Sequence, residues 1–165
     1  MIDALRAEYP GFDEFDATER ALLIAAHYAD TIKVREATGH NDGLYVERFL
    51  RTVGLHKGYP WCAAFVYACY REAGVATASL PIGGAAVRNW VKSPLVHKVP
   101  GPVRGDLGYW LNPNGTGHIF FCVRTEGAYV HTIEGNTDGL GSREGNGCFR
   151  RLRPINKVKY LRFIP

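Results

Sequence analysis

The chain has 165 residues, of which 46% are hydrophobic and 22% charged, and this balance predicts a single globular domain over residues 1–165. The net charge of +4 is mildly basic, and the clusters at 150–153 and 157–162 are most simply a solvated face. No apolar stretch is long enough to span a bilayer, and no nucleic-acid-binding motif is present, so we expect no membrane and no nucleic-acid partner.

The cysteines and histidines are not spaced like metal ligands. The four cysteines form no CxxC pair and are too sparse for a disulfide-stapled domain, so we interpret them as reduced thiols. The six histidines form no HxxxH or HxxEH pattern, so we expect no metal and no cofactor. The N-terminus has early acidic residues and no basic segment before an apolar run, so we expect no signal peptide for ordinary secretion.

An amphipathic pattern predicts the first long helix over residues 16–37. Asp16 is the expected N-cap, and Glu19 three residues later completes an arrangement like a capping box. We expect this helix to end near Gly39, in a cluster of turn-forming residues. Its expected buried side consists of Leu22, Leu23, Ala25, Ala26, Ala29 and Ile32.

Two shorter helices are also expected in the helical part of the chain, residues 1–95. Apolar residues at helical spacing predict one over 44–53, with Gly54 as its stop. Residues 85–91 form a further turn or two, in which Trp90 is a core or groove-lining residue. The Gly-rich loop before it lacks the pattern of a phosphate-binding loop.

From residue 96 the chain changes to short runs rich in aromatic and β-branched residues. Each run is bounded by Gly, Asn, Asp or Pro, as is typical of antiparallel strands. The expected strands are 107–111, 118–124, 129–134, 148–152 and 159–164. Helices followed by a meander of strands predict an α+β fold with a sheet of about five to six strands over residues 96–165.

Cys62 begins the helix around which the chain is organised. Pro60 suits the entry of this helix, apolar residues recur at helical spacing, and Gly74 suits its end. A cysteine in the first turn is next to unpaired N–H groups and the positive end of the helix dipole, which favour a thiolate. The alternative is that Cys62 is a small buried hydrophobe, which is our interpretation of Cys69 in the same helix.

The segment 115–137 is predicted to be a hairpin that turns at Glu126 and Gly127. Because side chains alternate along a strand, His118 shares a face with Phe120 and Cys122, and lies across from or diagonal to Glu134 and Asn136. A cysteine nucleophile needs a histidine to take its proton and a third polar group to orient the ring. The three side chains of the hairpin would meet this need.

Two alternatives remain for the hairpin. His118 is equally consistent with a structural strand residue that has a backbone partner, and 134–136 with an ordinary turn. His131 competes for the role of base, but it falls on the face opposite to Glu134. The residues alone therefore leave the pairing of Cys62 with His118 open.

Five motifs in order resemble the CHAP domain, the cysteine, histidine-dependent amidohydrolase/peptidase branch of the NlpC/P60-like papain-type hydrolases. They are GYPWCAAFVYACYREAG, GDLGYW, GTGHIFFCV, TIEGNT and GCFRRLRP. The similarity runs from about residue 41 to the C-terminus. It implies a papain-like α+β fold and cleavage of an amide or peptide bond in bacterial peptidoglycan. Cys122 departs from the pattern, since many relatives have an apolar or small residue there.

The resemblance also implies roles for individual residues. Cys62 matches the family nucleophile, His118 the general base, Glu134 the acidic residue that orients the histidine, and Asn136 the polar residue two positions later. More weakly, the resemblance suggests four residues that contact the oxyanion or the substrate. The four residues are Asn41, Asp42, Trp61 and Trp90.

A cell-wall substrate raises the question of how the protein reaches it. We expect a monomer that acts in the periplasm or outside the cell, delivered by a phage holin system or a toxin-injecting secretion machine, or made with a leader that is removed. A delivered toxin would imply an immunity protein as a further partner. The alternative function is a catalytically silent module that binds the wall or a partner. The sequence does not distinguish an amidase from an endopeptidase, because both use the same catalytic groups.

Overall fold

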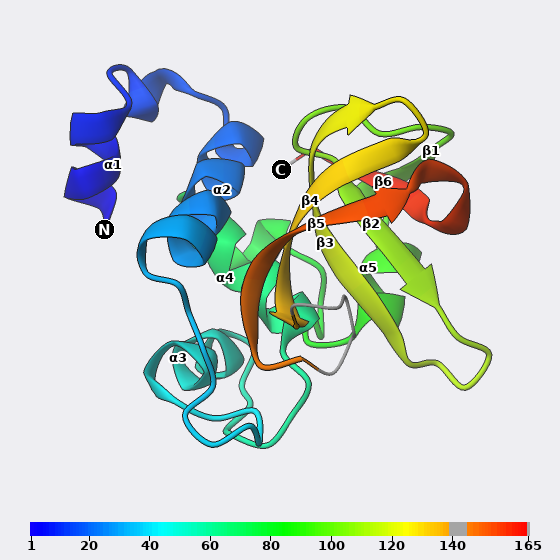
Figure 1. Cartoon of the computed structure of the whole chain (residues 1–165), viewed down its shortest axis with the longest axis horizontal. Coiled ribbons are helices and arrows are strands. Elements are labelled where there is room, and N and C mark those ends of the chain that lie inside the picture. Colours follow the sequence, from blue (N-terminus) through cyan, green and yellow to red (C-terminus); the bar gives the residue numbers. More distant parts are fainter. Residues whose placement is uncertain (139–144, 165) are drawn as a thin grey trace.

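The fold is known from a computed structural model, which describes residues 1–138 and 145–164. A six-stranded antiparallel sheet with the order β1-β6-β2-β3-β4-β5 lies beside the helices (Figure 1). The predicted α+β class is confirmed. The strands are β1 Val96–Val99, β2 Leu107–Leu111, β3 Gly117–Glu126, β4 Tyr129–Thr137, β5 Gly147–Pro154 and β6 Lys159–Phe163.

The α-helices come before the sheet in the chain. The longer ones are α1 Ile2–Glu8, α2 Ala17–Ala26, α3 Leu44–Thr52, α4 Cys62–Glu72 and α5 Val87–Lys92. Short helical turns are Phe12–Glu14, His27–Thr31, Thr77–Ser79 and Ile155–Lys157. In the described part of the chain, no helix has the length and apolar character that crossing a membrane requires.

Helix α4 is the centre of the core. Every residue from Cys62 to Tyr70 is buried, because α4 packs against α2 and α3 on one side and against β3 and β4 on the other. The ring of Phe65 makes edge-on contacts with Phe49 and Phe121, at centroid distances of 5.4 and 6.4 Å. The helix begins at Cys62, and Gly74 follows its end with a φ of 92°, as the sequence predicts.

The first long helix is shorter than the sequence predicts. Asp16 caps it by accepting a hydrogen bond from the Glu19 N–H, but α2 ends at Ala26 and passes into a π-helical turn, His27–Thr31. The backbone then leaves the helix to pair with β5, because the Val34 carbonyl accepts from the Cys148 N–H. Long-range pairing with the sheet thus replaces the last turns of the predicted helix.

The β3–β4 hairpin forms at the predicted place. Phe121 is opposite Ile133, and an irregularity between Cys122 and Arg124 shifts the register toward the turn. One face of the sheet carries Phe121 and Ile133 into the core with the helices. The other face holds a second, smaller cluster made of Phe120, Cys122, Val130 and Tyr160. His118 and Glu134 have the same alternation as this second face.

At Gly135, β4 lies directly against the start of α4. A Cβ at this position would lie 2.7 Å from the Phe65 ring and 2.8 Å from the Trp61 ring. Only glycine allows the strand to pack this close to the first turn of the helix. The contact therefore seats the start of α4 directly on the strand that carries Glu134.

Candidate active site

Cys62 is the first residue of α4 and lines a groove of about 270 Å³. Trp61 is the N-cap, no side chain caps the first-turn N–H groups, and the first turn carries no acidic residue. These N–H groups and the helix dipole therefore remain available to a negative charge at Cys62. The groove is lined by Leu55, Tyr59, Pro60, Cys62, Ala85, Ala86, Val87, Gly115, Thr116 and Gly117.

His118, near the start of β3, is completely buried beside Cys62. Its Nε2 lies 2.9 Å from Glu134 Oε2, while its Nδ1 has no hydrogen-bond partner in the described part of the chain. Burial lowers the pKa of His118, but its interactions with Cys62 and Glu134 outweigh burial and raise the pKa to about 9. The ring therefore lies close to Cys62, and its protonated form is favoured at neutral pH.

Glu134, on β4, is held by three side chains. Arg153 donates from Nε to Oε1 at 2.8 Å and from an Nη to Oε2 at 2.5 Å, and Thr132 donates its hydroxyl to Oε1 at 2.6 Å. Burial raises the pKa of Glu134, but Arg153 and His118 outweigh this effect and hold it at about 2. The carboxylate is therefore charged and fixed in orientation against the imidazole.

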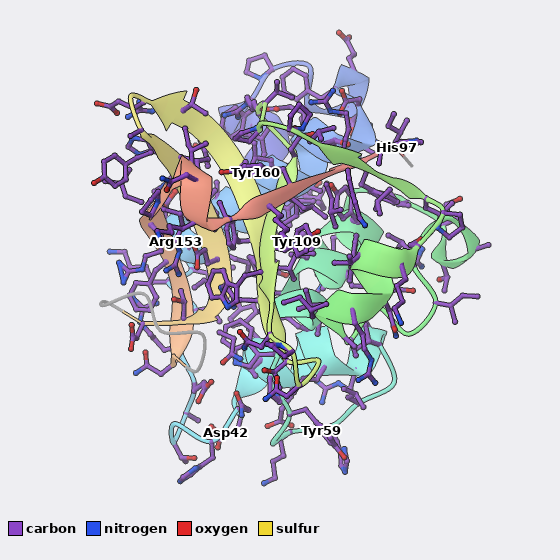
Figure 2. All side chains as sticks on the ribbon, turned by 90° about the vertical axis from the view of Figure 1, so that its right-hand side faces the viewer. Asp42, Tyr59, His97, Tyr109, Arg153 and Tyr160 are labelled. Carbon is purple, nitrogen blue, oxygen red and sulfur yellow. The ribbon has the colours of Figure 1, made fainter. Side chains whose placement is uncertain are left out.

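Aromatic rings flank the buried pair. Trp110 on β2 is directly opposite His118, and the centroids of the two rings are 4.8 Å apart. The guanidinium of Arg153, labelled in Figure 2, lies 5.1 Å from the Trp110 ring and 6.0 Å from the ring of Phe120. These contacts limit the movement of Arg153 and His118 and keep water from the bond between His118 and Glu134.

Asn136 is buried on the same strand as Glu134 but does not contact the histidine through a hydrogen bond. Its backbone has a φ of 57°, next to the register shift between Glu134 and Thr137. Neither atom of its side-chain amide has a hydrogen-bond partner within residues 1–138 and 145–164. The structure thus brings Cys62, His118 and Glu134 together, with Asn136 nearby as a buried and unpaired amide.

The competing histidine lies elsewhere. His131 Nε2 is 2.7 Å from Glu126 Oε2, at the turn of the hairpin. This is the opposite end of β3 from His118. His131 is therefore part of an exposed surface contact.

Asn41 and Asp42 lie in a loop joined to the segment before Cys62. The Gly58 N–H donates to the Asn41 carbonyl at 2.9 Å, and Figure 2 shows Asp42 and Tyr59 at the same end of the molecule. Asp42 accepts hydrogen bonds from the N–H and the hydroxyl of Thr38, which lower its pKa. A charged carboxylate has no proton to donate to an oxyanion, so of this pair only Asn41 has a side chain suited to that role.

Trp61 and Trp90 are both completely buried. The Trp61 indole donates to Glu36 at 2.8 Å, and the Trp90 indole donates to the Gly84 carbonyl at 2.9 Å. Trp90 also contacts Tyr70 and Phe163 in the core. Neither indole lines the groove at Cys62, so both tryptophans are core residues and not groove-lining ones.

Three residues around Glu134 and His118 were missed by sequence reasoning: Arg153, Thr132 and Trp110. Alternation alone puts Thr132 on the same face as Glu134, so that contact could have been found. Trp110 and Arg153 come from β2 and β5, and only the order of the strands brings them to the site. A single sequence does not reveal that order.

Comparison with protein families matches residues 54–136, just over half of the chain, to the CHAP domain. The matched segment includes Cys62, His118, Glu134 and Asn136. Searches of curated proteins and of solved structures found no significant match.

Proposed function

Because the chain belongs to the CHAP domain family, we propose that it cleaves an amide or peptide bond of bacterial peptidoglycan through a cysteine nucleophile. CHAP domains are typically hydrolases with peptidoglycan-related amidase or peptidase activity, so action on the cell wall follows from the family. The observation that carries the thiol mechanism is the buried hydrogen bond between the His118 ring and Glu134, together with the proximity of Cys62 that helps to raise the pKa of His118.

In the acylation step, the Cys62 thiolate attacks the carbonyl carbon of the scissile amide. The oxyanion that forms is stabilised by the Cys62 N–H and the uncapped first turn of α4, with the Asn41 amide as the candidate second donor. His118, protonated at neutral pH, gives its proton to the leaving nitrogen as the C–N bond breaks. The products are the free amine and a thioester on Cys62.

In the deacylation step, the neutral His118 takes a proton from water, and the hydroxide oxygen attacks the thioester. Collapse releases the carboxylic acid and restores the pair of Cys62 thiolate and protonated His118. Glu134 remains charged throughout and stabilises the imidazolium, while Arg153 and Thr132 hold Glu134 in position. Arg153 is therefore a positioning residue in this mechanism.

The proposal is tested by replacing the nucleophile. Cys62→Ala should abolish the loss of turbidity of purified cell walls, whereas Cys69→Ala, in the same helix, should retain it. Circular dichroism would check that both variants are folded. A Cys62→Ala protein with undiminished activity would overturn the mechanism. Mass spectrometry of the released muropeptides would identify the bond that is cut.

A thiol-labelling experiment separates this enzyme from a silent binding module of the same fold. Burial raises the pKa of Cys69, Cys122 and Cys148, so these thiols should react slowly with iodoacetamide. Cys62, at the groove and paired with His118, should be alkylated first and at neutral pH. Equal and slow labelling of all four thiols would favour the silent module.

A further inference from the structure

The segments that form the walls of the Cys62 groove contain very few acidic residues. The lining residues all lie within 55–117, and every one of them is uncharged apart from Cys62 when it is ionised. Between Glu47 and Glu126 the sequence has only two acidic residues, Glu72 and Asp106. The same stretch contains basic residues throughout, so its own net charge is positive.

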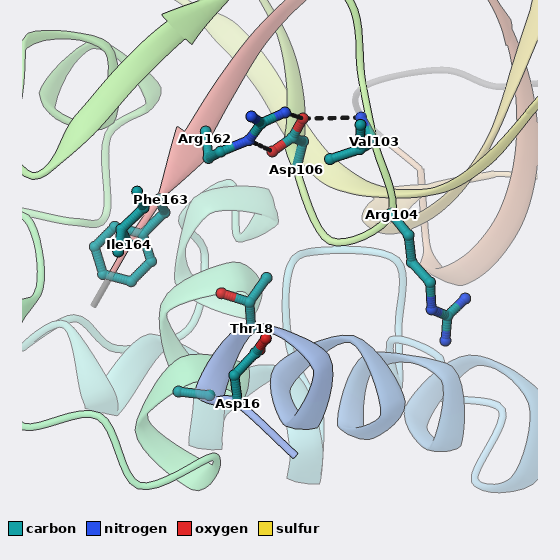
Figure 3. Close-up of a pocket in the computed structure, with 9 residues that line it drawn as sticks. Asp16, Thr18, Val103, Arg104, Asp106, Arg162, Phe163 and Ile164 are labelled. Carbon is teal, nitrogen blue, oxygen red and sulfur yellow. Dashed lines mark hydrogen bonds and ion pairs between the residues drawn. The ribbon is translucent and has the colours of Figure 1, made fainter.

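Both of these acidic residues are already neutralised. Glu72 pairs with Arg48 at 2.9 Å and accepts from the Tyr28 hydroxyl. Asp106 pairs with Arg162 at 2.8 Å, beside a separate cavity of about 380 Å³ (Figure 3). Arg104, at the edge of the same cavity, pairs with Glu19 outside the stretch. The charges around that cavity therefore compensate one another.

Arg88 differs from these arginines. It is exposed on α5, directly after the groove residue Val87, and it makes no ion pair or hydrogen bond with any part of the chain that the structure describes. One Nη of Arg88 lies 3.6 Å from the point where a Cβ on Gly115 would be. Gly115 lines the groove with a φ of 82° and has no side chain between the guanidinium and the groove.

We propose that Arg88 binds a free carboxylate of the peptide that occupies the Cys62 groove. The inference rests on the proposed function and narrows its substrate to peptides with a carboxylate close to the scissile amide. A guanidinium recognises a carboxylate through two parallel N–H···O bonds, which a carboxamide cannot accept in the same way. Arg88 thus discriminates between stem peptides with a free α-carboxyl group and stem peptides in which this group is amidated.

The test measures binding without turnover. Isothermal titration calorimetry with the Cys62→Ala protein would compare the tripeptide L-Ala–γ-D-Glu–L-Lys, with its C-terminus amidated, with its counterpart in which the α-carboxyl group of D-Glu is also a carboxamide. We expect the free acid to bind about 5-fold more tightly, the size of effect for a partly exposed pair. Raising the salt concentration should reduce the ratio, since exposed charges are screened.

Matched variants assign the effect to Arg88. Adding Arg88→Gln to the Cys62→Ala protein should remove the preference for the acid, and Arg88→Lys should keep part of it. Lys92→Gln is the control, because Lys92 is also a cation on α5 but lines a different cavity, beside Leu80 and Pro94. Lys92→Gln should leave the ratio of the two peptide affinities unchanged.

The outcomes separate the subsite from the proposed function. Equal affinities for the two peptides, no binding of either, or a preference that survives Arg88→Gln would overturn the subsite, even where the wild-type protein digests cell walls. A preference that depends on Arg88 in a protein that cleaves no wall would leave the subsite standing and refute the hydrolase.

Discussion

Replacing Glu134 with Gln removes the charge that joins Arg153 to His118 while it preserves the shape of the side chain. The pKa of Glu134 is about 2, compared with an ordinary value of 4.5, because Arg153 and His118 outweigh the effect of burial. A pKa difference of this size corresponds to about 3 kcal/mol of favourable interaction at neutral pH. Glu134→Gln should therefore lower the free energy of unfolding by about this amount at pH 7, which is a fall in Tm of roughly 6–12 °C.

The stabilising effect of Glu134 should depend on pH in a defined direction. Since the folded pKa is the lower one, the contribution of Glu134 is fully present above pH 4.5 and is lost as the pH falls toward 2. Urea unfolding of the wild type and of Glu134→Gln from pH 7 to pH 3 should show the two stabilities converge. Glu126→Gln, which removes an exposed partner of Arg124 and His131, is the control and should change stability little at any pH. If the free energies of unfolding of the wild type and of Glu134→Gln differed by the same amount at every pH, the reasoning would be refuted.

Two further predictions concern activity. Arg153→Met should lower kcat by up to about 100-fold, the cost of a misplaced catalytic group. Added guanidinium should restore part of it, whereas Arg150→Met, which breaks a surface pair with Asp30, should leave kcat unchanged. The kcat/KM of the wild type should fall as the pH rises through about 9, because His118 then loses the proton that the leaving amine needs. A flat profile up to pH 10 would contradict this assignment of the proton donor.

Local signals in the sequence were sufficient for most of the fold. Periodicity and stop signals place α3, α4 and α5 close to where they lie, and the five predicted strands correspond to β2 to β6. The strand β1 was missed, because VHKV is short, partly exposed and without clear alternation. The end of α2 was misplaced because the backbone near Val34 pairs with β5, an effect that no local pattern encodes.

In the candidate site, too, some contacts could be predicted from local sequence patterns and others could not. Alternation along the hairpin was enough to put His118 and Glu134 on one face, and the first turn of α4 made Cys62 a candidate nucleophile beside the alternative of a buried core residue. The contact of Glu134 with Arg153 depends on β5 lying next to β4 and on a long side chain that reaches along the sheet. Local sequence patterns do not encode which strands are neighbours, so this contact could not be predicted from the sequence.

Gly135 helps to set the distance between α4 and the strand that carries Glu134. Trp61 and Phe65 on either side of Cys62 rest on this glycine, while its neighbour Glu134 bonds to His118. The distance between Cys62 and His118, the proposed nucleophile and base, is therefore set by the contact of the Trp61 and Phe65 side chains with the backbone of Gly135. The walls of the groove can then vary, and with them the choice of substrate, while Cys62 and His118 keep their relative positions.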